Sequence, residues 1–133
     1  MLESERLLAL EAWVLRLREE LDGLLLLVEG KRDVQALAEL GIEGPVERIH
    51  AGRNLADRVE ELLQQGSRRW VPLLDDDRTG NTLLERVESL VAGRVAYDRR
   101  WRQDLMRIAK ARCIEDLAAE IQGLRARIHP KGL

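Results

Sequence analysis

Four acidic side chains directly follow two short apolar runs, at the points where strands are expected to end. Glu29 follows the run LLLLV, and three consecutive aspartates at 75–77 follow the run WVPLL. In a parallel sheet the carboxyl ends of the strands meet at one edge, where ligands bind. We therefore expect Glu29 and the aspartates to converge, although they are far apart in the sequence.

Converging carboxylates repel one another unless a cation neutralises them. Because the set contains no His or Cys, its hard oxygen ligands suit Mg²⁺, with Mn²⁺ as a substitute. One residue separates Asp75 from Asp77, so an extended turn can point both the same way and Asp76 elsewhere. We expect Asp76 to face water; the alternative is that it joins the metal shell. The pattern predicts a metal site made of Glu29, Asp75 and Asp77. The alternative is that 75–81 is a solvated turn and Glu29 caps a helix.

Glycines and cations flank these acids. Gly30 follows Glu29 and lets a phosphate or a backbone approach closely, and Gly80 permits a tight turn into the next helix. The candidate phosphate-binding cations are Lys31, Arg32, Arg53 and Arg78. They can stabilise charge on a phosphate, or they can simply balance the acidic cluster.

Apolar periodicity predicts the elements that position these groups. Helices are expected at 3–21, 32–40, 54–65, 82–92 and, with a break near Cys113, 99–128. The fourth of these is expected to begin at Thr82, because Glu85 three residues later completes a capping box. Strands are expected at 24–30, 45–50, 70–74 and 95–97. This alternation predicts an α/β sandwich with a mainly parallel, four-stranded sheet flanked by helices.

The 133 residues fit one domain. We expect an N-terminal amphipathic helix at 1–22 that packs on the core, a main domain at 23–128 that includes basic C-terminal helices, and a tail at 129–133. One cysteine excludes an intrachain disulfide and a multi-cysteine zinc site. With no membrane-spanning apolar run and no secretory pattern, we expect a cytoplasmic protein that does not bind membranes.

Charge is distributed unevenly along the chain. The net charge is -2, yet residues 94–133 carry 10 Lys+Arg and 5 Asp+Glu. This basic segment suits a polyanion-binding face or an ordinary charged surface. Six cations on it can track a nucleic-acid backbone: Arg99, Arg100, Arg102, Arg107, Lys110 and Arg112.

Two motifs carry a resemblance to a known family. VEGKRD at 28–33 and LLDDDRTG at 73–80 resemble the motifs of the Toprim domain, which topoisomerases, bacterial-type primases, repair proteins and small nucleases share. That family has a Glu after its first strand and an Asp-x-Asp after its third. Glu29, Asp75 and Asp77 occupy those positions.

The resemblance extends over about residues 20–120 and is nearest to the small stand-alone Toprim proteins found chiefly in archaea. It implies a three-layer, Rossmann-like sandwich in which the Asp pair chelates Mg²⁺ and the Glu either joins the metal shell or acts as general acid and base. Asp33 and Gly80 match common supporting positions. From the length of 133 residues we expect neither a complete topoisomerase nor a complete primase.

Two functions follow from these motifs. The leading one is a Mg²⁺-dependent nuclease, a hydrolase or related phosphoryl-transfer enzyme, with Glu29 as its catalytic residue. RNA is favoured over DNA, because a stand-alone relative with a defined role matures 5S ribosomal RNA. The alternative is a non-catalytic, Mg²⁺-dependent module that binds nucleic acid or a protein. A homodimer through the leucine-rich face of the N-terminal helix is a further expectation.

Overall fold

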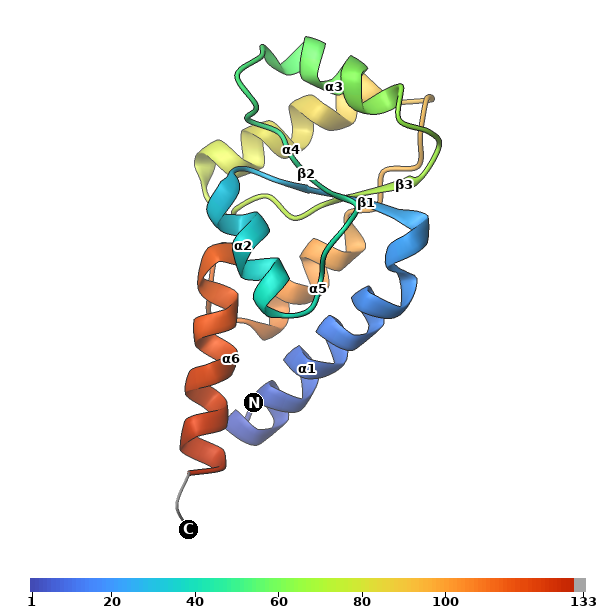
Figure 1. The fold of residues 1–133 in the computed structure, drawn as a ribbon. Helices are drawn as coiled ribbons and strands as arrows, with labels where there is room; N and C mark the ends of the chain where they lie inside the picture. The colour runs from blue at the N-terminus through green and yellow to red at the C-terminus, as the bar shows by residue number, and fades with distance from the viewer. Residues whose placement is uncertain (131–133) are drawn as a thin grey trace.

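The computed structural model describes residues 1–130, so residues 131–133 of the predicted tail lie outside the described part. Helices and strands alternate over most of its length (Figure 1). In chain order the elements are α1 (Glu3–Glu20), the short 3₁₀ helix η1 (Leu21–Gly23), β1 (Leu24–Val28), α2 (Lys31–Glu39), β2 (Val46–Arg48), α3 (Leu55–Leu63), β3 (Arg69–Pro72), α4 (Arg78–Val91), α5 (Arg100–Ile108) and α6 (Ile114–Ile128).

The sheet is parallel and has the strand order β2-β1-β3. All five residues of the central strand β1 are buried. A strand covered by helices on both faces needs such a continuous apolar run, which explains LLLLV. Val28 pairs with Arg48 and Leu27 with Pro72, so the three strands end at the same edge.

Helices cover both faces of the sheet and give three layers (Figure 1). Leu26 and Val28 join the core formed with α1, α2, α5 and α6. Leu25 and Leu27 point to the opposite face and pack with α3 and α4. The alternation of neighbouring side chains along β1 therefore builds two separate cores from one strand.

The sequence predicted a fourth strand at 95–97, and this prediction is wrong. The segment makes only one isolated bridge, between Trp70 and Tyr97. Trp70 N–H donates to Ala96 O at 2.8 Å, and Asp98 N–H donates to Trp70 O at 2.8 Å. Val95 N–H still donates to Val91 O at the end of α4. Because the start of the segment stays bonded to the end of α4, only the two bonds to Trp70 remain, and they make a single bridge rather than a strand.

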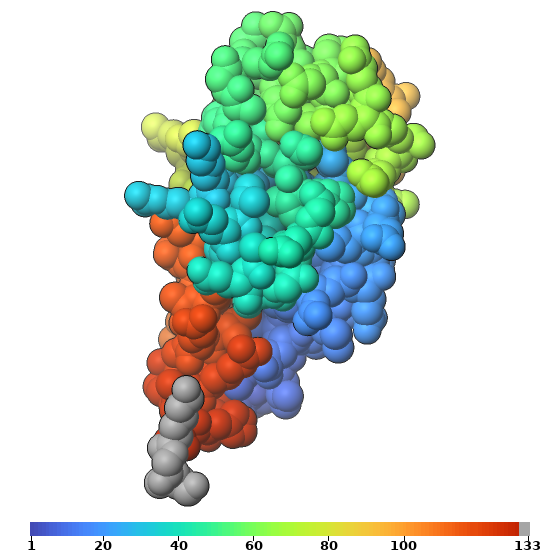
Figure 2. Space-filling model, viewed as in Figure 1, coloured from blue at the N-terminus to red at the C-terminus, as the bar shows by residue number. Residues whose placement is uncertain are grey.

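The N-terminal helix packs along the domain. Leu10, Trp13 and Leu17 of α1 are fully buried, and Trp13 Nε1–H donates to Trp101 O of α5 at 3.0 Å. Figure 2 shows the surfaces of α1 (blue) and α6 (red) meeting below α2. Leu8 and Leu15, on the outer side of α1, are exposed, and the homodimer stays a prediction. Within residues 1–130, no helix combines the length and apolar character needed to cross a membrane.

Candidate acidic site at the carboxyl edge of the sheet

The structure brings Glu29 and Asp75 together at the shared carboxyl edge. Glu29 directly follows β1, and Asp75 follows β3 after two further residues. The backbone N–H of Asp75 donates to Glu29 Oε2 at 2.8 Å, although 46 positions separate the two residues in the sequence. This bond fixes the end of β1 against the turn that follows β3.

Asp75 carries an unbalanced negative charge. Its Oδ1 atom is buried and has no hydrogen-bond partner among the residues described. Burial, and then the negative charges of Glu29, Asp33 and Asp77, together raise the pKa of this carboxyl to about 7. A proton or a cation at this oxygen would relieve both the burial cost and the repulsion.

Asp77 has a structural task that the sequence did not reveal. It is the N-cap of α4, where its Oδ1 accepts the N–H of Gly80 at 2.7 Å. The helix therefore begins at Arg78, one turn before the predicted start at Thr82. A capped first turn leaves the second carboxylate oxygen of Asp77 as the one available to a ligand.

Asp76 pairs with a guanidinium group instead of facing water alone. Its Oδ2 lies 3.0 Å from Arg112 Nη1, and its backbone N–H donates to Arg112 O at 2.7 Å. Asp76 thus ties the acidic turn to the segment between α5 and α6.

The two predicted glycines differ in what they do. A Cβ atom at Gly80 would lie 2.0 Å from the carbonyl oxygen of Asp75, so no other residue fits there without a shift of backbone. A Cβ atom at Gly30 would meet nothing within 4 Å, so the space in front of Gly30 is open to a ligand. Gly80 is therefore required by close packing against the acidic turn rather than by a special backbone angle.

Asp33 supports the first turn of α2. Its Oδ2 accepts the N–H of Gly30 at 3.1 Å, and its side chain is buried. Burial raises the pKa of this carboxyl; the Gly30 amide opposes that rise and the Glu29 charge adds to it. Asp33 therefore adds negative charge behind the site and fixes the backbone beside Glu29.

The four predicted phosphate-binding cations occupy different surroundings. Lys31 and Arg78 are exposed in the first turns of α2 and α4, next to the acids. Arg32 lies 3.5 Å from Glu115 on α6, and Arg53 lies 2.7 Å from Glu61 on α3. Both pairs are at the surface, where such pairs contribute little and an incoming phosphate can replace the carboxylate.

Arg102 is the site residue whose role the sequence analysis missed. It was placed among the nucleic-acid-binding cations, but its side chain is only 7% exposed and points inward. Its Nη2–H donates to Asp75 O at 2.7 Å. Its spacing from the buried Leu105 and Ala109 places all three on one helical face, a signal that could have identified it as an inward residue.

The other cations of the basic segment are mostly paired with acids. Arg99 lies 3.1 Å from Glu88, and Arg100 lies 3.0 Å from Asp98. Arg107 pairs with Asp104 on the same helix. The hydrogen bond from Arg100 lowers the pKa of the Asp98 carboxyl. The expected basic stripe is therefore largely neutralised by its own neighbours.

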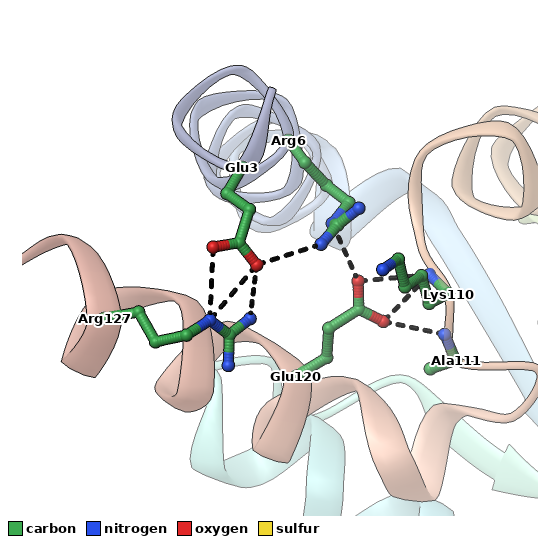
Figure 3. A network of polar contacts seen from close by, with 6 residues as sticks. All are labelled: Glu3, Arg6, Lys110, Ala111, Glu120 and Arg127. Carbon is green, nitrogen blue, oxygen red and sulfur yellow. Dashed lines mark hydrogen bonds and ion pairs between the residues drawn. The ribbon is translucent and has the colours of Figure 1, made fainter. Parts of the chain in front are cut away.

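A polar network holds the segment that carries Arg112 (Figure 3). Glu120 of α6 accepts the N–H groups of Lys110 at 3.0 Å and Ala111 at 2.7 Å. Arg6 of α1 lies 3.5 Å from the same carboxylate. The segment at 109–113 is thus fixed by α1 and α6, which in turn fixes its contact with the acidic turn.

Cys113, at the N-cap of α6, is not an activated thiol. Its Sγ lies 3.2 Å from Asp116 Oδ2. Burial and the hydrogen bond with Asp116 raise the pKa of the thiol to about 11. The thiol is therefore protonated near neutral pH and is a poor nucleophile.

The carboxylate oxygens of the acidic turn are suitable ligands for Mg²⁺, but their present arrangement does not form a metal site. Within residues 1–130, no three His, Cys, Asp or Glu side chains form a group that could hold a metal ion. Yet Asp75 Oδ1 lacks a partner and interacts electrostatically with Glu29 and Asp77. Carboxylate rotation, with Asp77 offering its free oxygen, would be needed to complete the set.

The raised pKa of Asp75 predicts how stability depends on pH without metal. The folded state keeps a proton on Asp75 that the unfolded chain has already lost, so stability should fall as pH rises from about 4 to about 7. We expect a loss of about 1–2 kcal/mol, because solvent screens part of the effect. Urea unfolding in EDTA at several pH values measures it, with Asp75→Asn as the control that flattens the slope. A wild-type slope equal to that of Asp75→Asn through this window would contradict the assignment.

Comparison with known proteins identifies a relative and a structural neighbour. A UPF0292 protein of Pyrococcus furiosus is 36% identical over 104 residues, which cover 77% of this chain and 77% of that protein. A solved structure of a protein from Aquifex aeolicus matches with a TM-score of 0.69 at 24% identity, covering 79% of this chain and 94% of the other. At that identity the structural match supports the fold alone. No protein-family model matches the chain.

Proposed function

The chain belongs to the UPF0292 family, and we propose that it is a Mg²⁺-dependent, Toprim-like nuclease that hydrolyses nucleic-acid phosphodiesters. The observation that carries this proposal is Asp75, which lies at the carboxyl edge beside Glu29 and whose buried Oδ1 has no hydrogen-bond partner within residues 1–130. A carboxyl with a pKa near 7 in such a place is costly for stability, which is typical of functional sites.

Each acid has a role in this proposal. Asp75 and the free oxygen of Asp77 hold Mg²⁺ or Mn²⁺. Glu29 uses Oε2 to accept the Asp75 N–H, so its other oxygen is left to complete the metal shell or to accept a proton from water. When bound, Mg²⁺ would supply charge neutralisation at a phosphate oxygen and orientation of a water nucleophile.

The surrounding cations suit a phosphate ligand. Lys31 and Arg78 extend from the first turns of two helices, whose N-termini attract anions. Arg32 and Arg53 can exchange their surface carboxylates for phosphate oxygens. Gly30 leaves open space beside Glu29 for the approach of the ligand. RNA remains the favoured substrate, on the Toprim resemblance.

One observation favours the second candidate, a non-catalytic Mg²⁺-dependent binding module. The arginines at 99, 100 and 107 are paired with acids, so this helix offers little free charge to grip a long nucleic acid. A short or flexible nucleic acid would need fewer contacts with this helix, so the paired arginines do not exclude hydrolysis. Hydrolysis therefore remains the leading proposal.

A cleavage assay tests the proposal. Labelled single- and double-stranded RNA and DNA are incubated with protein in Mg²⁺, Mn²⁺ or EDTA. We expect metal-dependent cleavage that falls by about 10² or more in Glu29→Gln, the range for loss of a general acid or base. Glu85→Gln, an exposed acid on α4, is the matched control and should cleave normally. Cleavage that persists in EDTA would overturn the proposal. If nothing is cleaved, but Mg²⁺ raises the melting temperature of wild type and not of Asp75→Ala, the binding module takes its place.

A further inference from the structure

The peptide group of Asp75 is held from both sides. Its N–H donates to Glu29 Oε2 at 2.8 Å, and its carbonyl oxygen accepts Arg102 Nη2–H at 2.7 Å. An acidic residue followed by two more in a turn would otherwise be free to move away from its neighbours. The two bonds fix both the position and the direction of the backbone that carries the Asp75 carboxylate.

Arg102 joins three parts of the fold. Its Nε–H donates to Leu74 O at 2.8 Å, just after β3, and its Nη2–H reaches Asn81 Oδ1 at 2.6 Å in the first turn of α4. The N–H of Asn81 in turn donates to Asp77 O at 2.8 Å. A single side chain from α5 therefore fixes the end of the strand, the acidic turn and the helix that Asp77 caps.

The chemistry of these bonds is unusual for a buried arginine. Within residues 1–130 the three acceptors are two carbonyl oxygens and one amide oxygen, with no carboxylate to compensate for the burial of the charge. A guanidinium keeps its charge even when buried. The positive charge thus lies against the backbone of the acidic turn, at the Asp75 carbonyl oxygen.

Gly80 closes the remaining side of the same carbonyl group. A Cβ atom at Gly80 would lie 2.0 Å from Asp75 O, so this oxygen is packed between Gly80 and the Arg102 guanidinium. Both groups at this contact belong to the backbone, so no side chain can rotate to make room for a larger residue at position 80.

We propose that Arg102 is the positioning residue of the acidic site: it clamps the Asp75 carbonyl and the first turn of α4, so that Asp75 and Asp77 face one cation together. The inference rests on the proposed function, because it assigns Arg102 an effect on metal affinity. Arg102 itself touches neither the cation nor the substrate.

Metal titration of three variants tests this inference. Arg102→Met removes the donors, Arg102→Lys keeps the charge with fewer fixed donors, and Arg107→Met removes an exposed arginine of the same helix. The Mg²⁺ dissociation constant, measured by calorimetry, should rise at least about 10-fold in Arg102→Met, the usual effect of losing a residue that orients metal ligands. Arg102→Lys should recover part of the affinity, and Arg107→Met should match the wild type. Equal affinity in all four proteins would overturn the inference.

Amide hydrogen exchange in metal-free protein separates this inference from the proposed function. In Arg102→Met the Asp75 amide should lose at least about 10-fold in protection, while the amides of Leu26 and Leu27 in β1 stay protected. If the wild type binds no Mg²⁺, the proposed function is wrong. The exchange result then still tests whether Arg102 holds the Asp75 backbone in place. If Arg102→Met does not fold, the same comparison is made with Arg102→Lys. Unchanged protection at Asp75 would overturn the clamp.

Discussion

The Asp75→Asn variant should be more stable than the wild type without metal and nearly inactive with it. Above pH 7 the wild-type carboxylate is ionised although burial and three neighbouring acids oppose the charge. Asparagine removes that charge and keeps the shape, so we expect a gain of about 1–2 kcal/mol in the free energy of unfolding at pH 8, allowing for solvent screening.

The activity of the same variant should change in the opposite direction. A metal ligand supplies several kcal/mol of transition-state stabilisation, which corresponds to a rate loss of about 10³-fold or more. Urea unfolding in EDTA and the cleavage assay in Mg²⁺ measure the two effects on one preparation. Asp76→Asn is the matched control: it breaks only the surface pair with Arg112 and should leave both quantities nearly unchanged.

A less stable or fully active Asp75→Asn would contradict the assignment. Loss of stability would mean that Asp75 makes favourable contacts rather than carrying an unbalanced charge. Normal activity would mean that phosphodiester chemistry takes place without this carboxylate.

The Gly80→Ala variant should lose about 2–3 kcal/mol of stability, although alanine is the better helix former. The added Cβ would lie 2.0 Å from the carbonyl oxygen, 2.8 Å from the carbonyl carbon and 3.1 Å from the nitrogen of Asp75. All three atoms are backbone, so the acidic turn or the first turn of α4 must shift, at the usual cost of overpacking.

A second helical glycine provides the control for this prediction. In Gly123→Ala, within α6, the new Cβ meets only the end of the flexible Arg127 side chain, at 3.4 Å. That variant should gain about 0.5–1 kcal/mol from helix propensity. Urea unfolding of both variants measures the difference in sign. Equal stability of the two would show that the acidic turn yields easily, and would weaken the account of a tightly held Asp75.

The central part of the site could be predicted because it depends on local pattern and parallel topology. The run LLLLV specifies a strand buried on both faces, and a parallel neighbour must then bring Asp75 to Glu29. The helix predicted from residue 54 also forms, because the Asn54 side chain accepts the N–H of Asp57 and caps the first turn of α3. Each of these features needs only neighbouring residues or a simple rule of sheet geometry.

Features decided by competing local signals or by distant partners could not be predicted. The start of α4 was misplaced because Thr82 and Glu85 match a capping box, while Asp77 caps the helix one turn earlier. The inward direction of Arg102 follows from its acceptors in the acidic turn, about 27 residues earlier in the chain. The expected fourth strand failed because Val95 stays bonded to the end of α4 and only one bridge forms with β3, which the hydrophobic pattern does not indicate.

The most direct test of the central claim is anomalous scattering from crystals grown in Mn²⁺. The account predicts a single strong Mn²⁺ peak at the carboxyl edge of the sheet, bound by Asp75 and by at least one of Glu29 and Asp77. The absence of a peak at saturating Mn²⁺, or a peak that does not involve Asp75, would contradict it.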